Sequence, residues 1–349
     1  MKIAVYTITK NEASHIERWA ESAKDADYRI VVDTGSTDDT VKTALESGCR
    51  VHVINVRPWR FDDARNAALS LVPDDVDFCI ALDADEVLVE GWRSSLEQVN
   101  PGVTRPRYNY VWSWNDDGTP GLMYSGDKIH ARQGYRWKHP VHEVLTPTST
   151  EVQDWCGLEI HHYPDLTKSR GQYLPLLELA VREDPTDDRN AHYLGREYFY
   201  HGRYALATHE LKRHLGLPNA RWAPERAKSM RLIAKCIPEE SETWFLRACA
   251  EDPSNRDQWV DLAQHYYEKN NWPQCYAAAT RALTITERNL VYINEATSWG
   301  SLPWDLAAIS AYHLGLFKSA LEFGTTALEC SPQDERLQAN MKWYNDALV

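Results

Sequence analysis

Two aspartates stand one residue apart, directly after a short apolar run. The run is Cys79-Ile80-Ala81-Leu82, and Asp83 and Asp85 follow it. The run indicates a buried strand, and in a strand residues two apart point to the same side. Both carboxylates would then face one cavity at the carboxyl edge of a sheet, where open α/β sheets bind ligands. Such a pair can bind a divalent cation that holds a substrate's phosphates, although Asp pairs are also common on solvated loops.

Strands and helices alternate around this pair, which predicts a mostly parallel sheet between helices with right-handed crossovers. The expected strands are Lys2–Ile8, Arg29–Asp33, Arg50–Val56 and Val76–Leu82. Three helices are expected between these strands. The first runs from an N-cap at Ser14 to about Ala23, the second has Val41, Ala44 and Leu45 on its buried face, and the third covers Phe61–Leu71. Residues 104–147 read as β-rich, and Leu158–Pro164 as a further strand.

Four motifs follow one another in order in this α/β region. They are Lys10-Asn11-Glu12, Val32-Asp33-Thr34-Gly35-Ser36-Thr37-Asp38, Asp62-Asp63-Ala64-Arg65-Asn66-Ala67-Ala68 and Leu82-Asp83-Ala84-Asp85-Glu86. Together they resemble the N-terminal half of family-two glycosyltransferases with the GT-A fold. The likeness is to the bacterial branch that carries helical repeats behind the catalytic domain. It covers residues 1–90 and, more loosely, 125–215.

The resemblance implies a nucleotide-sugar site. The residues it assigns to the donor are Thr7, Asn11, Glu12, Asp33, Arg65 and Asp83. Asp33 would accept a hydrogen bond from the base, and we expect that base to be uracil. Arg65 would lie near the base or the phosphates, although a structural salt bridge to Asp33 or Asp63 is an alternative.

The resemblance also implies Mn²⁺ or Mg²⁺ bound by Asp83, Asp85 and a histidine. Asp83 would reach the ribose or the metal, and Asp85 would bind the metal that bridges the two phosphates. His162 aligns best with the family's metal-binding histidine. His161 is adjacent and would point to the other side of its strand.

An inverting transfer needs a base on the face opposite the leaving group. The segment Trp137-Lys138-His139-Pro140-Val141-His142-Glu143 resembles the family's G-x-V-H-E segment, and it departs from that pattern at His139-Pro140. Glu143 is the candidate base and His142 the rival, and either could be structural.

Composition sets further limits. The chain has 349 residues, enough for two domains, and a net charge of −13, which disfavours a broad nucleic-acid-binding surface. A local basic cluster, Lys128 to His139, lies beside the expected site. No apolar run is long enough for a membrane span, no signal peptide is evident, and the seven scattered cysteines are typical of reduced thiols. We therefore expect a cytoplasmic protein.

The C-terminal half contains a repeat. Asp184-Pro185 recurs as Asp252-Pro253, and Tyr204 and Trp272 share this offset of twice 34 residues, which is the tetratricopeptide period. The expected copies are residues 187–217, 221–251, 255–285 and about 303–330, with an insertion before the last copy. Generic helical hairpins are the alternative.

We therefore predict an α/β GT-A domain at residues 1–168 and an all-α tetratricopeptide-like domain at 169–349. The predicted function is a metal-dependent, inverting hexosyl- or pentosyltransferase that uses a UDP-sugar. The repeats would recruit the acceptor, a glycan or peptide, or form a homodimer. The alternatives are a catalytically degenerate repeat scaffold, and a modified base of phage-type DNA as acceptor.

Overall fold

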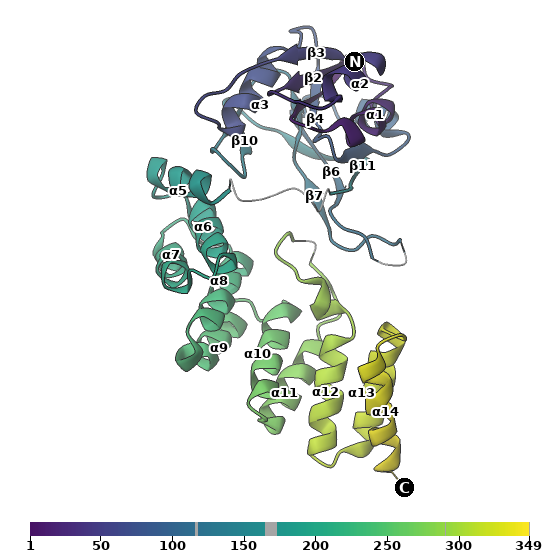
Figure 1. The fold of residues 1–349 in the computed structure, drawn as a ribbon, viewed down its shortest axis with the longest axis vertical. Coiled ribbons are helices and arrows are strands. Elements are labelled where there is room, and N and C mark those ends of the chain that lie inside the picture. Colours follow the sequence, from purple (N-terminus) through teal and green to yellow (C-terminus); the bar gives the residue numbers. More distant parts are fainter. Residues whose placement is uncertain (116–117, 165–172, 290, 349) are drawn as a thin grey trace. The chain divides into compact units, whose positions relative to one another are not determined.

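The computed structural model describes all residues except 116–117, 165–172, 290 and 349. The chain forms two compact units (Figure 1), which are Met1–Ala180 with Leu290–Tyr292, and Val181–Asn289 with Ile293–Val349. The predicted boundary between residues 168 and 169 lies outside the described residues, so it stays a prediction.

The first unit is built on a five-stranded sheet of order β3-β2-β1-β4-β8. Its first four strands are parallel, and β8 is antiparallel to β4. The strands are β1 (Ile3–Thr9), β2 (Tyr28–Asp33), β3 (Arg50–Val53), β4 (Phe78–Ala81) and β8 (Ile129–Ala131). The predicted parallel sheet is therefore confirmed, with β3 and β4 shorter than expected.

Helices cover this sheet because both of its faces are apolar. Ile3 and Val5 of β1 belong to one buried cluster, which includes Trp19 of α1. Ala4 and Tyr6 belong to another, which includes Ala68 of α3. The helices of this region are α1 (Ala13–Ser22), α2 (Thr40–Glu46), α3 (Phe61–Ser70) and α4 (Trp92–Glu97). Ser14 lies inside α1 instead of capping it, so that predicted N-cap is wrong.

A second sheet, of order β5-β11-β6-β7, follows in the first unit. Its strands are β5 (Glu86–Leu88), β6 (Arg105–Val111), β7 (Met123–Gly126) and β11 (Gln153–His162). A two-stranded ribbon pairs β9 (Tyr135–Lys138) with β10 (Val144–Pro147). The β-rich region expected at 104–147 is confirmed. The sequence also predicts a turn at Asn115-Asp116-Asp117-Gly118, which falls partly on residues that are not described.

The second unit consists of helical pairs at the predicted positions. They are α6 (Asp188–Tyr200) with α7 (Tyr204–Gly216), α8 (Ala223–Cys236) with α9 (Ser241–Glu251), α10 (Arg256–Glu268) with α11 (Trp272–Leu283), and α12 (Leu302–His313) with α13 (Phe317–Cys330). Helix α5 (Tyr173–Glu183) precedes them, α14 (Glu335–Asp346) follows, and short 3₁₀ turns are η1 (Pro238–Glu240) and η2 (Ala296–Trp299).

Left-handed residues close the turns inside the first, third and fourth of these pairs. Gly202 and Gly315 have φ of 68° and 74°, and Asn270 has φ of 54° at the corresponding place in the third pair. Close packing also needs glycine at position 195, because a Cβ there would lie 2.6 Å from the Leu211 Cγ. The 34-residue spacing therefore reflects a repeated helix–turn–helix unit.

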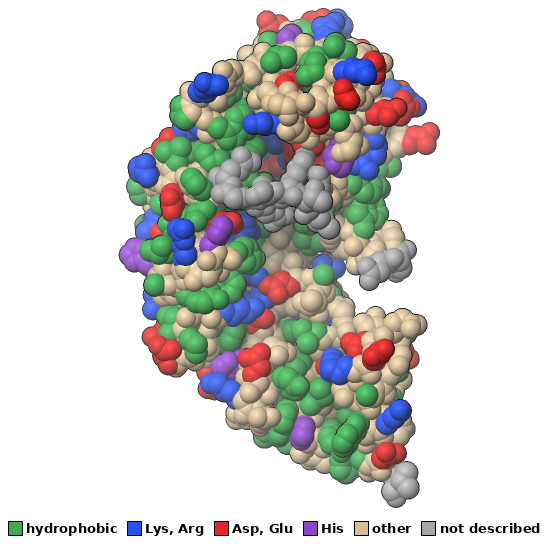
Figure 2. Space-filling view, viewed as in Figure 1, with side chains coloured by type: hydrophobic (Ala, Val, Ile, Leu, Met, Phe, Trp, Pro, Cys, Tyr) green, Lys and Arg blue, Asp and Glu red, His purple; other side chains and the backbone are tan. Residues whose placement is uncertain are grey.

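On the face shown in Figure 2, Lys and Arg side chains are interspersed with Asp and Glu side chains. This face therefore has no broad basic surface. No helix among the described residues is long and apolar enough to cross a membrane. All seven cysteines are free thiols.

Candidate active site

The aspartate pair lies in the turn between β4 and β5. Strand β4 ends at Ala81, so Asp83 and Asp85 do not continue its alternation, and their carboxylates have different partners. The turn is fixed from within, because the backbone N–H of Asp83 donates to Glu86 Oε2 at 2.8 Å. Glu86 itself is buried at the start of β5. The pair therefore presents two neighbouring but distinct sites.

Asp83 is bound between two cations. Arg65 Nη2 donates to its Oδ1 and Lys128 Nζ to its Oδ2, both at 2.6 Å. Lys128 Nζ also donates to Glu86 Oε1 at 2.9 Å, and the Tyr110 hydroxyl donates to the same oxygen at 2.6 Å. The fold brings these residues together from helix α3, from the β4–β5 region, from β6 and from the residue before β8.

Opposite charges control ionisation in this cluster. Burial alone would raise the pKa of Asp83, but Arg65 and Lys128 hold that pKa well below its usual range. Burial would lower the pKa of Lys128, but Asp83 and Glu86 raise it well above its usual range. The carboxylate and the ammonium therefore both remain charged at neutral pH.

Arg65 also reaches the candidate base. Its side chain is only 7% exposed, and its Nε forms an ion pair with Glu143, whose side chain is 10% exposed. The guanidinium carbon lies 4.9 Å from the centre of the Trp137 ring. Nη1 of Arg65 is buried and makes no hydrogen bond within the described part of the chain. This nitrogen is therefore the part of the anchored guanidinium that still requires a partner.

His142 lies next to Glu143 in sequence but has a different environment. Its ring packs against that of Tyr173 on α5, with centroids 5.6 Å apart. His139 and His142 have φ of 80° and 48°, which are uncommon for residues other than glycine. The residue of this segment that forms an ion pair with Arg65 is Glu143.

Asp85 faces His162 at the end of β11. Asp85 Oδ2 lies 3.4 Å from His162 Nε2, and the two side chains are 26% and 8% exposed. His162 Nδ1 lies 3.0 Å from the carbonyl oxygen of Trp112, and a carbonyl can only accept, so Nδ1 carries the proton. In the neutral ring Nε2 then has a lone pair directed toward the carboxylate. His161 instead pairs with Glu159.

The other predicted donor residues lie around the ends of β1 and β2. The Asp33 carboxylate is nearly inaccessible, and its Oδ1 accepts from the backbone N–H groups of Gly35 and Ser36 at 2.9 and 3.0 Å. Asn11 Oδ1 accepts from the N–H of Thr37 at 2.8 Å. These contacts hold the turn at 34–37 in place.

Thr7 and Glu12 also have local partners. Thr7 is fully buried on β1, and its hydroxyl lies 3.3 Å from the Ile8 carbonyl. The backbone N–H of Glu12 donates to the Thr40 hydroxyl at 2.7 Å. The roles assigned to Thr7, Asn11, Glu12 and Asp33 in donor binding stay predictions.

Sequence reasoning did not assign roles to Lys128, Glu86 and Trp112. Lys128 was recognised only as a member of a basic cluster, and Glu86 only as the last residue of a motif. The Trp112 ring stacks on His162 with centroids 4.3 Å apart. The alternating aromatic pattern of residues 108–114 was the available signal, but it is equally typical of ordinary strand packing.

Comparison with known proteins identifies the α/β region. Residues 4–99 match the model of the family described as glycosyl transferase family 2. An uncharacterized glycosyltransferase of Rickettsia felis is 38% identical over 109 residues, which are 31% of this chain and 37% of that protein. The chain thus matches little more than a third of the length of that relative.

A second relative spans both units. A TPR repeat-containing protein of Synechococcus elongatus is 26% identical over 315 residues, which cover 81% of this chain and 75% of that protein. This agrees with the helical pairs described above.

Two solved structures align with different parts of the chain. MamA is 16% identical and covers 50% of this chain and 99% of its own, with a TM-score of 0.38. Glucosyl-3-phosphoglycerate synthase of Mycobacterium tuberculosis is 23% identical and covers 38% and 57%, with a TM-score of 0.29. Scores this low do not establish a shared fold. Tetratricopeptide-like helical pairs follow the α/β region. The family match, with the motifs that lie within it, identifies residues 4–99 as a domain of glycosyl transferase family 2.

Proposed function

We propose that this chain is a metal-dependent, inverting glycosyltransferase that moves one hexosyl or pentosyl group from a UDP-sugar to an acceptor. The observation that carries the proposal is the proximity of Asp85 to His162 Nε2 beside the Arg65, Asp83 and Glu143 cluster. A carboxylate, a correctly oriented imidazole and an anchored guanidinium suit a diphosphate and its counter-cation.

The Asp85 and His162 pair fits a divalent cation. The backbone carbonyl of Trp112 fixes the His162 ring through Nδ1, which is the usual arrangement behind a metal-binding histidine. Asp83 is the third expected ligand, but both of its oxygens pair with Arg65 and Lys128 here, so it would need to exchange one of these partners. A bound Mn²⁺ or Mg²⁺ would supply positive charge that stabilises the departing nucleoside diphosphate.

Arg65 and Glu143 supply the remaining chemistry. Nη1 of Arg65 can donate to a phosphate oxygen of the donor without giving up its bonds to Asp83 and Glu143. Glu143 can accept the proton of the acceptor hydroxyl as that oxygen attacks the anomeric carbon. The environment of Glu143 supports it over His142, whose ring lies against Tyr173.

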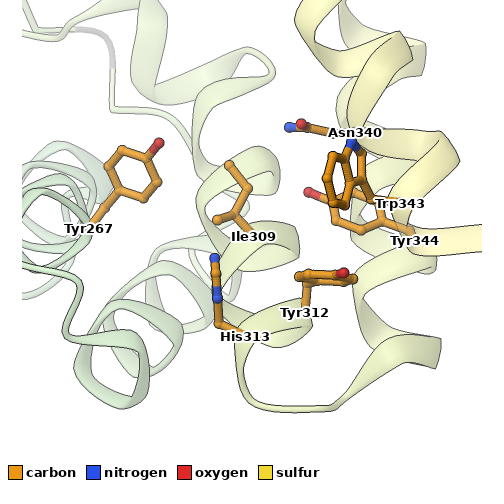
Figure 3. Close-up of a pocket in the computed structure, with 7 residues that line it drawn as sticks. All are labelled: Tyr267, Ile309, Tyr312, His313, Asn340, Trp343 and Tyr344. Atoms are coloured by element: carbon orange, nitrogen blue, oxygen red, sulfur yellow. The ribbon is translucent and has the colours of Figure 1, made fainter. Parts of the chain in front are cut away.

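The acceptor class is proposed from the second unit. A hollow of about 290 Å³ opens among α10, α12 and α14 (Figure 3), and Tyr267, Tyr312, Trp343 and Tyr344 are among its lining residues. Aromatic faces suit sugar rings and nucleic-acid bases alike, so the hollow is compatible with both classes of acceptor. The net charge of −13 disfavours DNA, so a glycan or a peptide is the favoured acceptor over a modified DNA base.

A catalytically degenerate scaffold is the second candidate function. Two observations favour it: cations occupy both oxygens of Asp83, and the Asp33 carboxylate is used inside its own turn.

Hydrolysis and binding assays separate the two candidates. A panel of nucleotide sugars is incubated with and without Mn²⁺, and UDP binding is measured by calorimetry. Asp85→Ala should abolish metal-dependent UDP binding and hydrolysis while circular dichroism stays unchanged. Glu90→Ala, which removes an exposed acid nearby, should behave like the parent. Full activity of Asp85→Ala in EDTA would refute the metal-dependent mechanism, and no binding of any donor by the parent would favour the scaffold.

A further inference from the structure

Three helix ends of the second unit meet around a buried histidine. Asp188 is the first residue of α6, His214 is in the last turn of α7, and Glu225 is in the first turn of α8. One ligand atom from each residue lies within 4.8 Å of the others. The three residues are far apart in the sequence, and the packing of the first two helical pairs brings them together.

The two acids alone would not indicate a site. Negative charge at a helix N-terminus and positive charge at a C-terminus both complement the helix dipole. The helix dipoles therefore account for these acids, and for a histidine at the end of α7, without any ligand.

His214 supplies the independent observation. Its side chain is completely buried, and its Nε2 makes no hydrogen bond within the described ranges. This atom lies 3.4 Å from Glu225 Oε1, without the alignment that a hydrogen bond requires. An unsatisfied buried nitrogen is costly and calls for a partner.

The 3.4 Å separation fits two ligands of one metal ion. Zinc lies about 2.0–2.1 Å from histidine nitrogen and carboxylate oxygen, so two such ligands at a tetrahedral angle are about 3.3–3.4 Å apart. Three protein ligands are sufficient for zinc when water takes the fourth position. Asp188 is only half-buried, so water can reach the site.

The other ring nitrogen of His214, Nδ1, has a hydrogen-bond partner. Ser229 Oγ lies 2.9 Å from His214 Nδ1 and 2.8 Å from His192 Nδ1. A hydroxyl has one proton, so it can donate to His192 while it accepts from His214. In that arrangement His214 Nδ1 carries the ring proton, and Nε2 presents its lone pair to Glu225. An outer partner that fixes the tautomer in this way is typical of metal-binding histidines.

We propose that Asp188, His214 and Glu225 bind a divalent cation of the zinc class, which joins the ends of α6, α7 and α8. The cation would stabilise the first two helical pairs and has no part in sugar transfer. The site is independent of the proposed donor site, so either can exist without the other.

The test measures Zn²⁺ binding to the full chain after metal removal, in competition with a chromophoric chelator. All proteins carry Asp85→Asn, so that the donor site does not contribute. We expect one tight Zn²⁺ equivalent, and a rise in the temperature of thermal unfolding when Zn²⁺ is added. Asp188→Asn, at a half-exposed helix end, and Ser229→Ala should each weaken binding by about 10–100-fold.

His214→Gln should abolish Zn²⁺ binding, and the other variants keep the result decisive if His214→Gln fails to fold. Glu335→Gln removes an acid from the first helical position of α14, the same place in its helix as Asp188, and it should leave Zn²⁺ affinity unchanged. The proposal is overturned if the Asp85→Asn protein binds no Zn²⁺, or if Asp188→Asn and Ser229→Ala both bind it as tightly as their parent. The latter result would leave His214 as a purely structural residue.

Discussion

His130 should make the first unit sensitive to mild acid. Its ring is completely buried on β8, and its Nδ1 donates to the carbonyl of Ala131 at 2.8 Å. Its Nε2 lies 3.2 Å from the Tyr6 hydroxyl, which accepts from Trp137 Nε1 at 2.9 Å. The Tyr6 proton is therefore available to His130, and both ring nitrogens are satisfied when the ring is neutral.

The size of the effect follows from the pKa. Burial, with smaller contributions from Arg105 and Arg132, lowers the pKa of His130 from 6.5 to about 4. Below pH 6.5 the unfolded chain takes up a proton that the folded chain does not, so acid favours unfolding. This stability is present above the unfolded pKa and is lost as pH falls toward 4. The loss between pH 7 and pH 5 is about 2 kcal/mol, equivalent to about a 30-fold change in the opening equilibrium.

Hydrogen exchange measures this loss without requiring the two units to unfold together. Exchange of β1 and β4 amides, followed by mass spectrometry and corrected for intrinsic rates, reports the opening free energy of the first unit. Between pH 7 and pH 5 protection should fall about 30-fold more in the parent than in His130→Gln. His15→Gln, on the partly exposed part of α1, is the control and should follow the parent. Equal pH dependence in the parent and His130→Gln would refute the reasoning.

Two further predictions concern transfer. Glu143→Gln keeps the size of the side chain but removes the proton acceptor, so kcat should fall about 10²–10⁴-fold with little change in donor affinity; a nearly normal Glu143→Gln beside an inactive His142→Ala would reverse the assignment. A chain ending after Glu183 keeps α5 and its Tyr173 contact, so it should bind UDP but lose transfer to the natural acceptor more than donor hydrolysis. Equal loss of transfer and hydrolysis in a folded truncation would mean that the repeats support the catalytic domain instead of binding the acceptor. Light scattering on the full chain and on the truncated chain tests whether the repeats form a homodimer.

Local patterns in the sequence predicted most of the fold. Apolar runs followed by polar turns predicted the parallel strands, because a strand buried on both faces must be apolar along its length. The 34-residue offset predicted the helical pairs, because each pair must bury the same face against its neighbour. Element ends were less accurate: β3 and β4 are shorter than expected, and Ser14 lies inside α1, since propensity alone does not fix where hydrogen bonding stops.

The sequence by itself determined which residues could do chemistry, but not which of them meet. The spacing of Asp83 and Asp85 predicts that they face one cavity together, but the strand ends before them. Asp83 therefore pairs with Arg65 and Lys128, whereas Asp85 faces His162. Arg65 and Glu143 are 78 residues apart, and no local pattern predicts their contact. The tautomer of His162 likewise depends on a carbonyl 50 residues away. Only the tertiary structure decides such contacts, because they arise from the packing of separate strands and loops rather than from the periodicity of any one of them.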